Sequence, residues 1–238
     1  MLDLSKIRAI TLDLDDTLWP IWPTIERAER VLQGWLQAHA PATALLFASP
    51  HARRELRDAT ELQWPELTHD LSAMRRESIR LALQRSGDDD RLAEAAFDVF
   101  FAERMQVTLF DDAHSSLAWL AERFPIVALS NGNADVHQVG IGAFFAGSVS
   151  ARDVGVGKPD PRIFHAAAEF LQVEPHAVLH VGDDAALDVL GALGAGMQAV
   201  WVNRADHLWT QGLHPHATVG TLTELCDLLA PPAQPDSA

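Results

Sequence analysis

The spacing of apolar residues divides the chain into two regions with different predicted structure. From residue 24 to about residue 107, apolar side chains recur at helical spacing and no segment alternates as a strand would. Thr24 is placed to cap the first of these helices, ahead of an apolar stripe formed by Ile25, Ala28, Val31, Leu32 and Trp35. Pro41 and Pro50 interrupt the pattern, and three more helices are predicted over 51–63, 68–85 and 88–105.

Outside this region, short apolar strands alternate with helical segments. The predicted strands are 7–12, 125–129, 147–150, 177–181 and 198–202, and the predicted helices are 112–123, 134–145, 161–171, 185–195 and 221–229. Such alternation indicates an α/β fold with a parallel sheet covered by helices on both faces. The predicted core comprises 1–19 and 107–238, with an all-helical insert over 20–106. The Pro-rich tail 231–238 is expected to fray.

Polar clusters follow three of these strands, and the first cluster is the most unusual. Asp13 and Asp15 stand two residues apart at the end of an extended segment, so their side chains are predicted to share one side. Two carboxylates about 4 Å apart repel by roughly 4 kcal/mol at a surface-like dielectric. Either a cation lies between them or one holds a proton, and both states serve chemistry. The alternative is an acidic turn without function.

The other two clusters begin at Ser130 and Asp183, and ligands of parallel sheets bind beyond the carboxyl ends of the strands. Carboxylates from Asp13, Asp15 and Asp183 would suit a hard cation such as Mg²⁺. Singly, these groups also have structural interpretations. Ser130-Asn131-Gly132 could be a turn, Lys158 a surface residue, Asp184 a helix cap and Asp188 part of a solvated face.

Together, the clusters fit the handling of a phosphate group. Lys158, the Ser130 hydroxyl and the Asn131 amide could hold a phosphate dianion beside the metal. A carboxylate can accept a phosphoryl group, and a second carboxylate can protonate the leaving oxygen and then activate water. The sequence therefore predicts phosphoryl-transfer chemistry.

Composition narrows the partners and the setting. The 238 residues carry a formal net charge of -15, which argues against nucleic acid and anionic membranes, although a small phosphorylated metabolite can still be bound by a local cationic site. The single cysteine, Cys226, cannot form an internal disulfide, and no apolar run is long enough to span a bilayer. A cytoplasmic location is expected. The oligomeric state is not readable from the sequence.

Four motifs in order resemble the haloacid dehalogenase-like superfamily of aspartate-nucleophile phosphotransferases. They are Asp-Leu-Asp-Asp-Thr-Leu at 13–18, Leu-Ser-Asn at 129–131, Lys158-Pro159 and Gly182-Asp183-Asp184 with Asp188 beyond it. The resemblance implies a Rossmann-like core, a helical cap after the first motif, and Mg²⁺ held by Asp13, the Asp15 carbonyl and Asp183, supported by Asp184 or Asp188. It makes Asp13 the nucleophile, Asp15 the general acid/base, and Thr17, Ser130 and Lys158 phosphate-site residues. Asp16 replaces a glycine common in the family.

A narrower likeness points to one bacterial branch. Asp-Asp-Thr-Leu-Trp at 15–19, Ser-Asn-Gly-Asn at 130–133, His-Val-Gly-Asp-Asp at 180–184 and Gly-Met-Gln-Ala at 196–199 look like phosphatases of flavin mononucleotide and of the phosphoribityl-aminouracil precursor of riboflavin. Trp19 and Trp22 follow the catalytic turn and could stack on a flat ring or pack the cap against the core.

Several other functions compete with this interpretation. A phosphomutase would share all of the motifs, whereas 2-haloacid dehalogenases of the same fold lack the second aspartate, here Asp15. A receiver module of phospho-signalling also combines acidic residues with a lysine, but it has no ninety-residue helical insert. His207, His214 and His216 are too loosely spaced to favour a zinc site over a surface loop.

Overall fold

The computed structural model describes residues 1–231, and a six-stranded parallel sheet forms its core. The strands are β1 (Ala9–Leu12), β2 (Ile126–Ser130), β3 (Gly147–Ser150), β4 (Val178–Gly182), β5 (Gln198–Val202) and β6 (Ala217–Val219). Their order in the sheet is β3-β2-β1-β4-β5-β6, with every neighbouring pair parallel. This is the strand order of the Rossmann fold, so the predicted fold class is confirmed.

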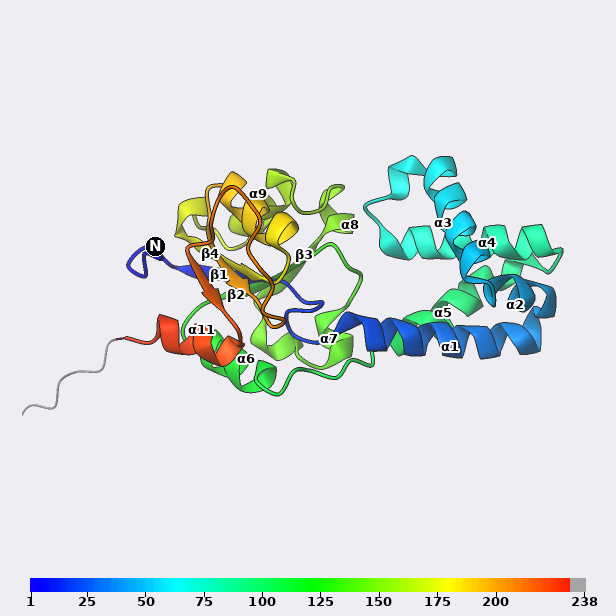
Figure 1. Cartoon of the computed structure of the whole chain (residues 1–238), viewed down its shortest axis with the longest axis horizontal. Coiled ribbons are helices and arrows are strands. Elements are labelled where there is room, and N and C mark those ends of the chain that lie inside the picture. Colours follow the sequence, from blue (N-terminus) through cyan, green and yellow to red (C-terminus); the bar gives the residue numbers. More distant parts are fainter. Residues whose placement is uncertain (232–238) are drawn as a thin grey trace, which may run out of the picture.

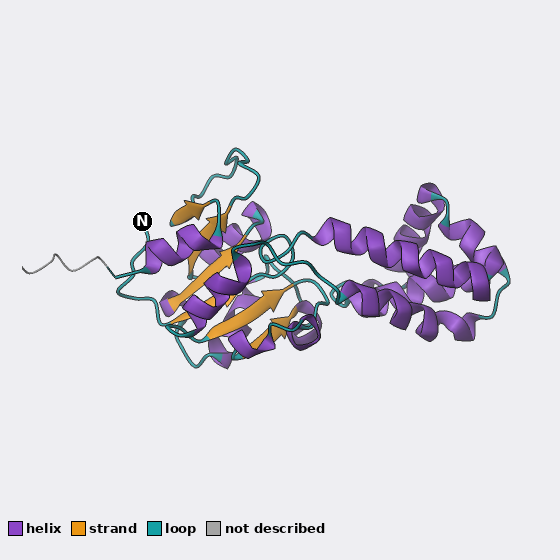
Figure 2. Ribbon diagram, turned by 90° about the horizontal axis from the view of Figure 1, so that it is seen from below, coloured by secondary structure: helices purple, strands orange, loops and turns teal. Residues whose placement is uncertain are grey.

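Helices cover both faces of the sheet, as Figure 2 shows. Alternate residues of the buried strands supply the two cores, and in β2 Ile126 and Ala128 face one layer while Val127 and Leu129 face the other. The first layer contains α6 (Ala113–Ala121) and α11 (Leu222–Leu229); the second contains α9 (Pro161–Phe170) and α10 (Gly191–Gly194). Cys226 lies buried in the first layer as a free thiol.

All helices and strands named between β1 and α6 are helices, and they form a separate body beside the core (Figure 1). It consists of α1 (Ile21–His39), α2 (Pro41–Phe47), α3 (Pro50–Gln63), α4 (Leu71–Ser86) and α5 (Ala93–Arg104), with short 3₁₀ turns at Pro65–Leu67 and Asp90–Leu92. α1 and α5 lie side by side, and their ends carry the two connections to the core. The helices enclose their own apolar cluster, which includes Leu32, Leu36, Leu56, Ile79 and Phe97. We call this body the cap; the domain limits at 19/20 and 106/107 stay a prediction.

Several local predictions are corrected by the structure. Pro41 and Pro50 do not merely interrupt a helix: each is the first residue of a new one, where a missing N–H costs nothing. The helix within 134–145 is short and interrupted by a glycine, as predicted: Gly140 adopts a left-handed φ of 92° and ends α7 (Val136–Val139). β6 was not predicted, since its three residues carry too little pattern. The tail 232–238 lies outside the described residues.

The start of α1 also differs from the sequence prediction. The helix begins at Ile21, so Thr24 lies inside it and is not the cap. The carboxylate of Asp16 accepts a hydrogen bond of 2.9 Å from the Ile21 N–H instead. The turn that follows β1 is therefore tied directly to the first cap helix. Within residues 1–231, no helix combines the length and apolar character that crossing a bilayer requires.

Candidate active site

The candidate site lies where the strand order of the sheet reverses. β1 and β4 are neighbours, β1 continuing towards β2 and β3 while β4 continues towards β5 and β6. Asp13 directly follows β1, and Asp183 directly follows β4. The register that pairs Leu12 with Val181 brings these strand ends level. Crevices at such switch points are where open α/β sheets bind ligands.

Three carboxylates converge at this point. Asp13, Asp183 and Asp188 offer oxygen atoms that all lie within 4.8 Å of one another. Asp188 comes from the π-helical turn η5 (Ala185–Leu190), which follows β4 and returns the chain to the strand end. Gly182 permits this return, because a Cβ there would lie 2.3 Å from the Asp188 Cγ. The cluster is thus built from two strand ends and one turn.

A buried lysine partly balances this cluster. The Lys158 ammonium donates to Asp13 Oδ1 at 2.5 Å and to Asp188 Oδ1 at 2.6 Å. Burial alone would lower the pKa of Lys158, but the two carboxylates outweigh it and raise the pKa above its usual range. Burial also favours protonated Asp188, yet Lys158 and His180 hold the pKa of Asp188 below its usual value. Lys158 and Asp188 are therefore a charged pair in the interior.

The other two carboxylates, Asp183 and Asp13, are costly to ionise in the metal-free site. Burial raises the pKa of Asp183 to about 7, and repulsion by Asp188 adds to the shift. Burial likewise raises the pKa of Asp13, against the attraction of Lys158 and with help from Asp188 and Asp183. Such shifts mean that the ionised cluster costs free energy without a further cation.

His180 supports the cluster from inside β4. Burial lowers its pKa, so the imidazole is neutral. Its Nε2 lies 3.1 Å from Asp188 Oδ1, and its Nδ1 lies 2.9 Å from the Thr11 hydroxyl. In the tautomer that donates to the carboxylate, Thr11 donates to Nδ1, and both ring nitrogens are satisfied. His180 was not predicted as a site residue; a histidine inside an apolar strand is the signal that could have found it.

Asp15 does not join this cluster through its side chain. Both of its carboxylate oxygens accept from Arg104 Nη2 at 2.7 Å, and Oδ1 also accepts from Trp19 Nε1 at 2.8 Å. The two carboxylates of the first motif thus have separate cationic partners, which removes the repulsion expected between them. Trp19 is fully buried and holds Asp15, so it is not free to stack on a ligand.

Arg104 was also missed by the sequence analysis. It ends α5 and its side chain is only 2% exposed, so the cap supplies a buried partner to Asp15 in the core. Within the described chain, its Nη1 is buried without a hydrogen-bond partner. The buried positions of α5 are Ala93, Ala96, Phe97, Phe100 and Arg104. This spacing places Arg104 on the apolar stripe, and a charged residue on such a stripe is the signal.

The predicted phosphate-site residues divide into two groups. Ser130 Oγ accepts from the Gly132 N–H at 2.9 Å, which leaves its hydrogen free to donate to a ligand. Asn131 instead pairs with the backbone of Lys158, donating from Nδ2 at 2.9 Å and accepting at Oδ1 at 2.6 Å. Its amide therefore fixes the lysine loop. Gly157 makes room for it, since a Cβ there would lie 2.7 Å from Asn131 Oδ1.

Two more predicted residues have hydrogen-bond partners within the protein. The Thr17 hydroxyl donates to Asp183 Oδ1 at 2.9 Å and so orients a candidate metal ligand. Asp184 caps η5, accepting from the N–H groups of Ala186 and Leu187 at 2.8 Å each. Its carboxylate lies outside the metal-site cluster, and of the two supporting residues expected from the sequence, only Asp188 belongs to it.

A charge count favours a divalent cation at this site. Asp13, Asp183 and Asp188 contribute three negative charges, and Lys158 contributes one positive charge. The remainder of two negative charges matches one divalent cation, and an all-oxygen donor set suits a hard ion. The residues present therefore fit Mg²⁺.

The fold and site define an α/β enzyme with an acidic centre beneath a helical cap, and comparison with known proteins identifies the family. Residues 7–196 match the model of the haloacid dehalogenase-like hydrolases, and the chain belongs to this family of enzymes.

Individual relatives cover nearly the whole chain. One is the 5-amino-6-(5-phospho-D-ribitylamino)uracil phosphatase YigB of Escherichia coli, 35% identical over 95% of this chain and 98% of its own. Another is a phosphoserine phosphatase of Thermus thermophilus, 30% identical over 92% and 98% of the two chains. A solved structure described as a 2-haloacid dehalogenase from Pseudomonas syringae pv. tomato superposes with a TM-score of 0.89 at 36% identity, covering 94% and 98%. The resemblance stated from the sequence is thus confirmed.

Proposed function

We propose that this enzyme is a Mg²⁺-dependent phosphatase that hydrolyses a small phosphate monoester through an aspartyl-phosphate on Asp13. The observation that carries the proposal is the convergence of Asp13, Asp183 and Asp188 around Lys158 at the switch point of the sheet. The Asp13 carboxylate can accept the phosphoryl group, and the cationic groups around it can neutralise the charge of the phosphate.

Asp13, Asp183 and Asp188 would hold the metal, with the backbone carbonyl of Asp15 added by the family resemblance. Bound there, the ion would offset the charge of the carboxylates and polarise a phosphate oxygen. Lys158 and the Ser130 hydroxyl would donate to the remaining phosphate oxygens. Thr17 and His180 act indirectly, by orienting Asp183 and Asp188.

The chain's own residues would carry two successive displacements. A carboxylate oxygen of Asp13 attacks phosphorus, the bond from phosphorus to the ester oxygen breaks, and Asp15 gives that oxygen a proton. Water then attacks the phosphorus of the aspartyl-phosphate, Asp15 takes a proton from it, and the Asp13 carboxylate is released with inorganic phosphate. In this structure the Asp15 carboxylate accepts hydrogen bonds from Arg104 and Trp19. To donate a proton to the leaving oxygen, one carboxylate oxygen of Asp15 must first give up its hydrogen bond from Arg104.

For the substrate we favour a phosphate ester on a ribityl chain, with flavin mononucleotide or the riboflavin precursor as leading candidates. The name of the Escherichia coli relative supports this choice. Trp22 supports it as well, because its indole is 69% exposed at a cavity in the cap and is free to stack on a ring for about 0.5–1.5 kcal/mol beyond burial. The charge of -15 disfavours nucleic acid. A cytoplasmic location stays a prediction.

The test begins with a panel of phosphate monoesters assayed with Mg²⁺. Hydrolysis of p-nitrophenyl phosphate is expected to vanish with a chelator and to return when Mg²⁺ is added. Asp13→Asn is expected to abolish turnover, and a phosphate transition-state mimic should label Asp13 in mass spectrometry. Full activity without metal, or labelling of another carboxylate, would overturn the proposal.

Dehalogenation is the second candidate, favoured by the description of the Pseudomonas structure. Both reactions use an aspartate nucleophile, but halide is a stable leaving group that needs no proton, so Asp15 and its two partners would then have no task. Release of chloride from 2-chloropropionate, measured beside phosphate release, separates the two. A phosphomutase would instead convert a sugar phosphate to its isomer without net phosphate release.

A further inference from the structure

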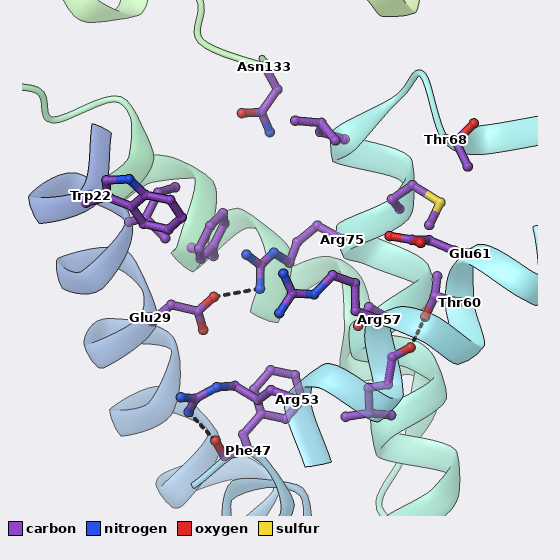
Figure 3. Close-up of a pocket in the computed structure, with 16 residues that line it drawn as sticks. Trp22, Glu29, Phe47, Arg53, Arg57, Thr60, Glu61, Thr68, Arg75 and Asn133 are labelled. Atoms are coloured by element: carbon purple, nitrogen blue, oxygen red, sulfur yellow. Dashed lines mark hydrogen bonds and ion pairs between the residues drawn. The ribbon is translucent and has the colours of Figure 1, made fainter. Parts of the chain in front are cut away.

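The cap contains a cavity that reaches the loop after β2 of the core. It has a volume of about 600 Å³ and is enclosed by α1, α3, α4 and α5 (Figure 3). Asn133, in the loop after β2, is its one lining residue from the described part of the core. A second cavity of about 500 Å³ reaches Asn131 and Lys158, and both cavities are lined by Thr68 and Leu71 of the cap. A molecule whose phosphate lies near Lys158 can therefore extend past Leu71 into the cap.

This cap cavity is cationic, although the chain as a whole is strongly acidic. Arg53, Arg57 and Arg75 line it, and Figure 3 shows the last two pointing inward from α3 and α4. Arg75 is occupied: it pairs with Glu29 at 2.7 Å and lies over the Phe100 ring. Arg53 donates to the carbonyl of Phe47.

The side chain of Arg57 makes no hydrogen bond to any residue of the described chain. Among residues 1–231, no carboxylate lies within ion-pairing distance of Arg57 or of Arg53. The half-buried Arg53 and the exposed Arg57 therefore retain unused donors at the wall of the cavity, and Glu61 is the only other lining carboxylate besides Glu29 in the described chain. Guanidinium groups with free donors recognise oxygen acceptors on a ligand.

The walls around these donors are apolar and aromatic. Trp22, Phe47, Leu56, Met74 and Phe100 contribute to them, and Trp22 stands at the end near Asn133. A cavity of this size accommodates a group much larger than a serine or a triose. The aromatic side chain of Trp22 favours a planar ring, because such a ring can stack on the indole, whereas a sugar offers no aromatic face.

We propose that the cap cavity binds the leaving group of the substrate, that this group is a planar heterocycle bearing carbonyl oxygens, and that Arg57 and Arg53 donate to those oxygens. The inference rests on the proposed phosphatase activity and deepens it. It makes Arg57, Arg53 and Trp22 determinants of specificity, while the phosphate is bound by the core.

Binding of riboflavin, which lacks the phosphate, tests the site without catalysis. We expect the wild-type enzyme to quench flavin fluorescence, and we expect Trp22→Ala to abolish the quenching because the stacking partner is gone. Arg57→Gln should raise the dissociation constant of riboflavin on the order of tenfold, because about one charge-assisted hydrogen bond is lost. Arg54→Gln is the matched control, because Arg54 is an exposed arginine of α3 like Arg57 but does not line the cavity. Equal riboflavin affinity in wild type and Arg57→Gln, with Arg53→Gln also unchanged, would overturn the inference.

Kinetics separate failure of this inference from failure of the proposed function. Arg57→Gln should lower kcat/KM for flavin mononucleotide on the order of tenfold and leave p-nitrophenyl phosphate nearly unchanged, because the smaller ring does not reach α3. If neither substrate is hydrolysed by the wild type, the phosphatase proposal fails. If the wild type hydrolyses both substrates, and Arg57→Gln leaves both rates unchanged or lowers both by the same factor, only the cavity assignment fails. If a substrate with a carboxylate tail, such as phosphoserine, shows the arginine dependence instead, the heterocycle is wrong.

Discussion

At the scale of single residues, Asp16 explains how the catalytic turn tolerates a residue other than glycine. Its φ of 59° lies in the left-handed region, which aspartate enters more readily than most residues. Its carboxylate then caps α1 through the Ile21 N–H. Burial raises the pKa of Asp16, and the charge of Asp15 adds to this, so a neutral side chain of the same shape suits the position.

Three substitutions at this position separate backbone strain from capping. Asp16→Ala should lower the free energy of unfolding by about 1–3 kcal/mol, since it loses the cap and keeps the strained φ. Asp16→Gly loses the cap but relieves the strain, and should change stability by less than about 1 kcal/mol. Asp16→Asn should be close to wild type. Urea denaturation measures all three, and equal stability of the alanine and asparagine variants would contradict the capping role.

Arg104 is the residue through which the cap reaches Asp15, the proposed general acid/base. It holds both oxygens of Asp15, and only it and Trp19 donate to that carboxylate among the described residues. A misplacement of a catalytic group by about 1 Å can cost 10²-fold in rate. Arg104 is thus a positioning residue, and its contribution should appear wherever proton transfer by Asp15 limits the rate.

Arg104→Lys keeps the charge, but the shorter lysine side chain ends short of the position from which Arg104 Nη2 donates to both Asp15 oxygens. We expect kcat for an alkyl phosphate to fall by about 10- to 100-fold, and kcat for p-nitrophenyl phosphate to fall much less, because its leaving oxygen needs little protonation. Asp15→Asn should show the same substrate pattern with a larger loss. Equal losses for the two substrates in Arg104→Lys would indicate a general structural defect and refute the positioning role.

At the scale of elements, the turn from β4 into η5 delivers two carboxylates to one point. Asp183 ends the strand, and Asp188 returns from η5 because Gly182 leaves space for it. Asp184 stabilises the same turn by capping η5 and by donating its N–H to Asp188 Oδ2 at 2.9 Å. A parallel arrangement holds Lys158, whose loop is fixed by the side chain of Asn131.

Gly182→Ala tests whether this close approach is needed. The added methyl group would collide with the buried Asp188 carboxylate, and we expect a loss of about 1–3 kcal/mol in stability with loss of most activity. Gly194→Ala is the control: it lies in α10, nothing lies within 4 Å of its added Cβ, and stability should rise by about 0.5–1 kcal/mol. A Gly182→Ala enzyme with normal stability and turnover would show that Asp188 can move freely.

At the scale of the whole molecule, charge is distributed unevenly between the active site and the cap. The strand ends carry an excess of carboxylate, and the cap cavity carries an excess of guanidinium, within a chain of net charge -15. A divalent cation that binds only the folded enzyme must stabilise it by mass action.

Mg²⁺ at 100 times its dissociation constant should stabilise the enzyme by about 2.7 kcal/mol, or roughly 5–10 °C in Tm for a chain of this size. Asp183→Asn is expected to lose most of this shift, whereas Asp184→Asn should keep it because Asp184 caps η5 and lies outside the cluster. Thermal unfolding followed by circular dichroism gives both values. A shift lost equally in the two variants would contradict the assignment of the metal ligands.

The metal-free enzyme should respond to pH in a way set by the same carboxylates. The pKa of Asp183 is raised to about 7, so the folded state binds more protons than the unfolded state between about pH 4 and 7, and stability falls as the pH rises through this window. Asp183→Asn should show a shallower fall. Denaturation of both proteins in chelator at several pH values measures the difference. Identical pH profiles would show that the pKa of Asp183 is not raised in the folded state.

Local patterns predicted much of this molecule. Short apolar runs placed five of the six strands, helical spacing placed most of the helices, and the polar residues after β1, β2 and β4 predicted where the site would form. This succeeded because apolar runs, helix periodicity and the rule that parallel strands carry ligands at their carboxyl ends depend on residues close in sequence. The motifs also sufficed to identify the family.

The partners of each site residue were decided only by the tertiary structure. Arg104 meets Asp15 across 89 positions, and Thr11 meets His180 across 169, distances over which no spacing rule operates. Thr17 and Asn131 were predicted as phosphate-site residues, and only the packing placed one beside Asp183 and the other beside the Lys158 backbone. The sequence by itself therefore determined which chemistry is present and at which edge of the sheet. The tertiary structure determined the hydrogen-bond partner of each site residue, because buried polar atoms bond to whichever group the packing brings within hydrogen-bonding distance.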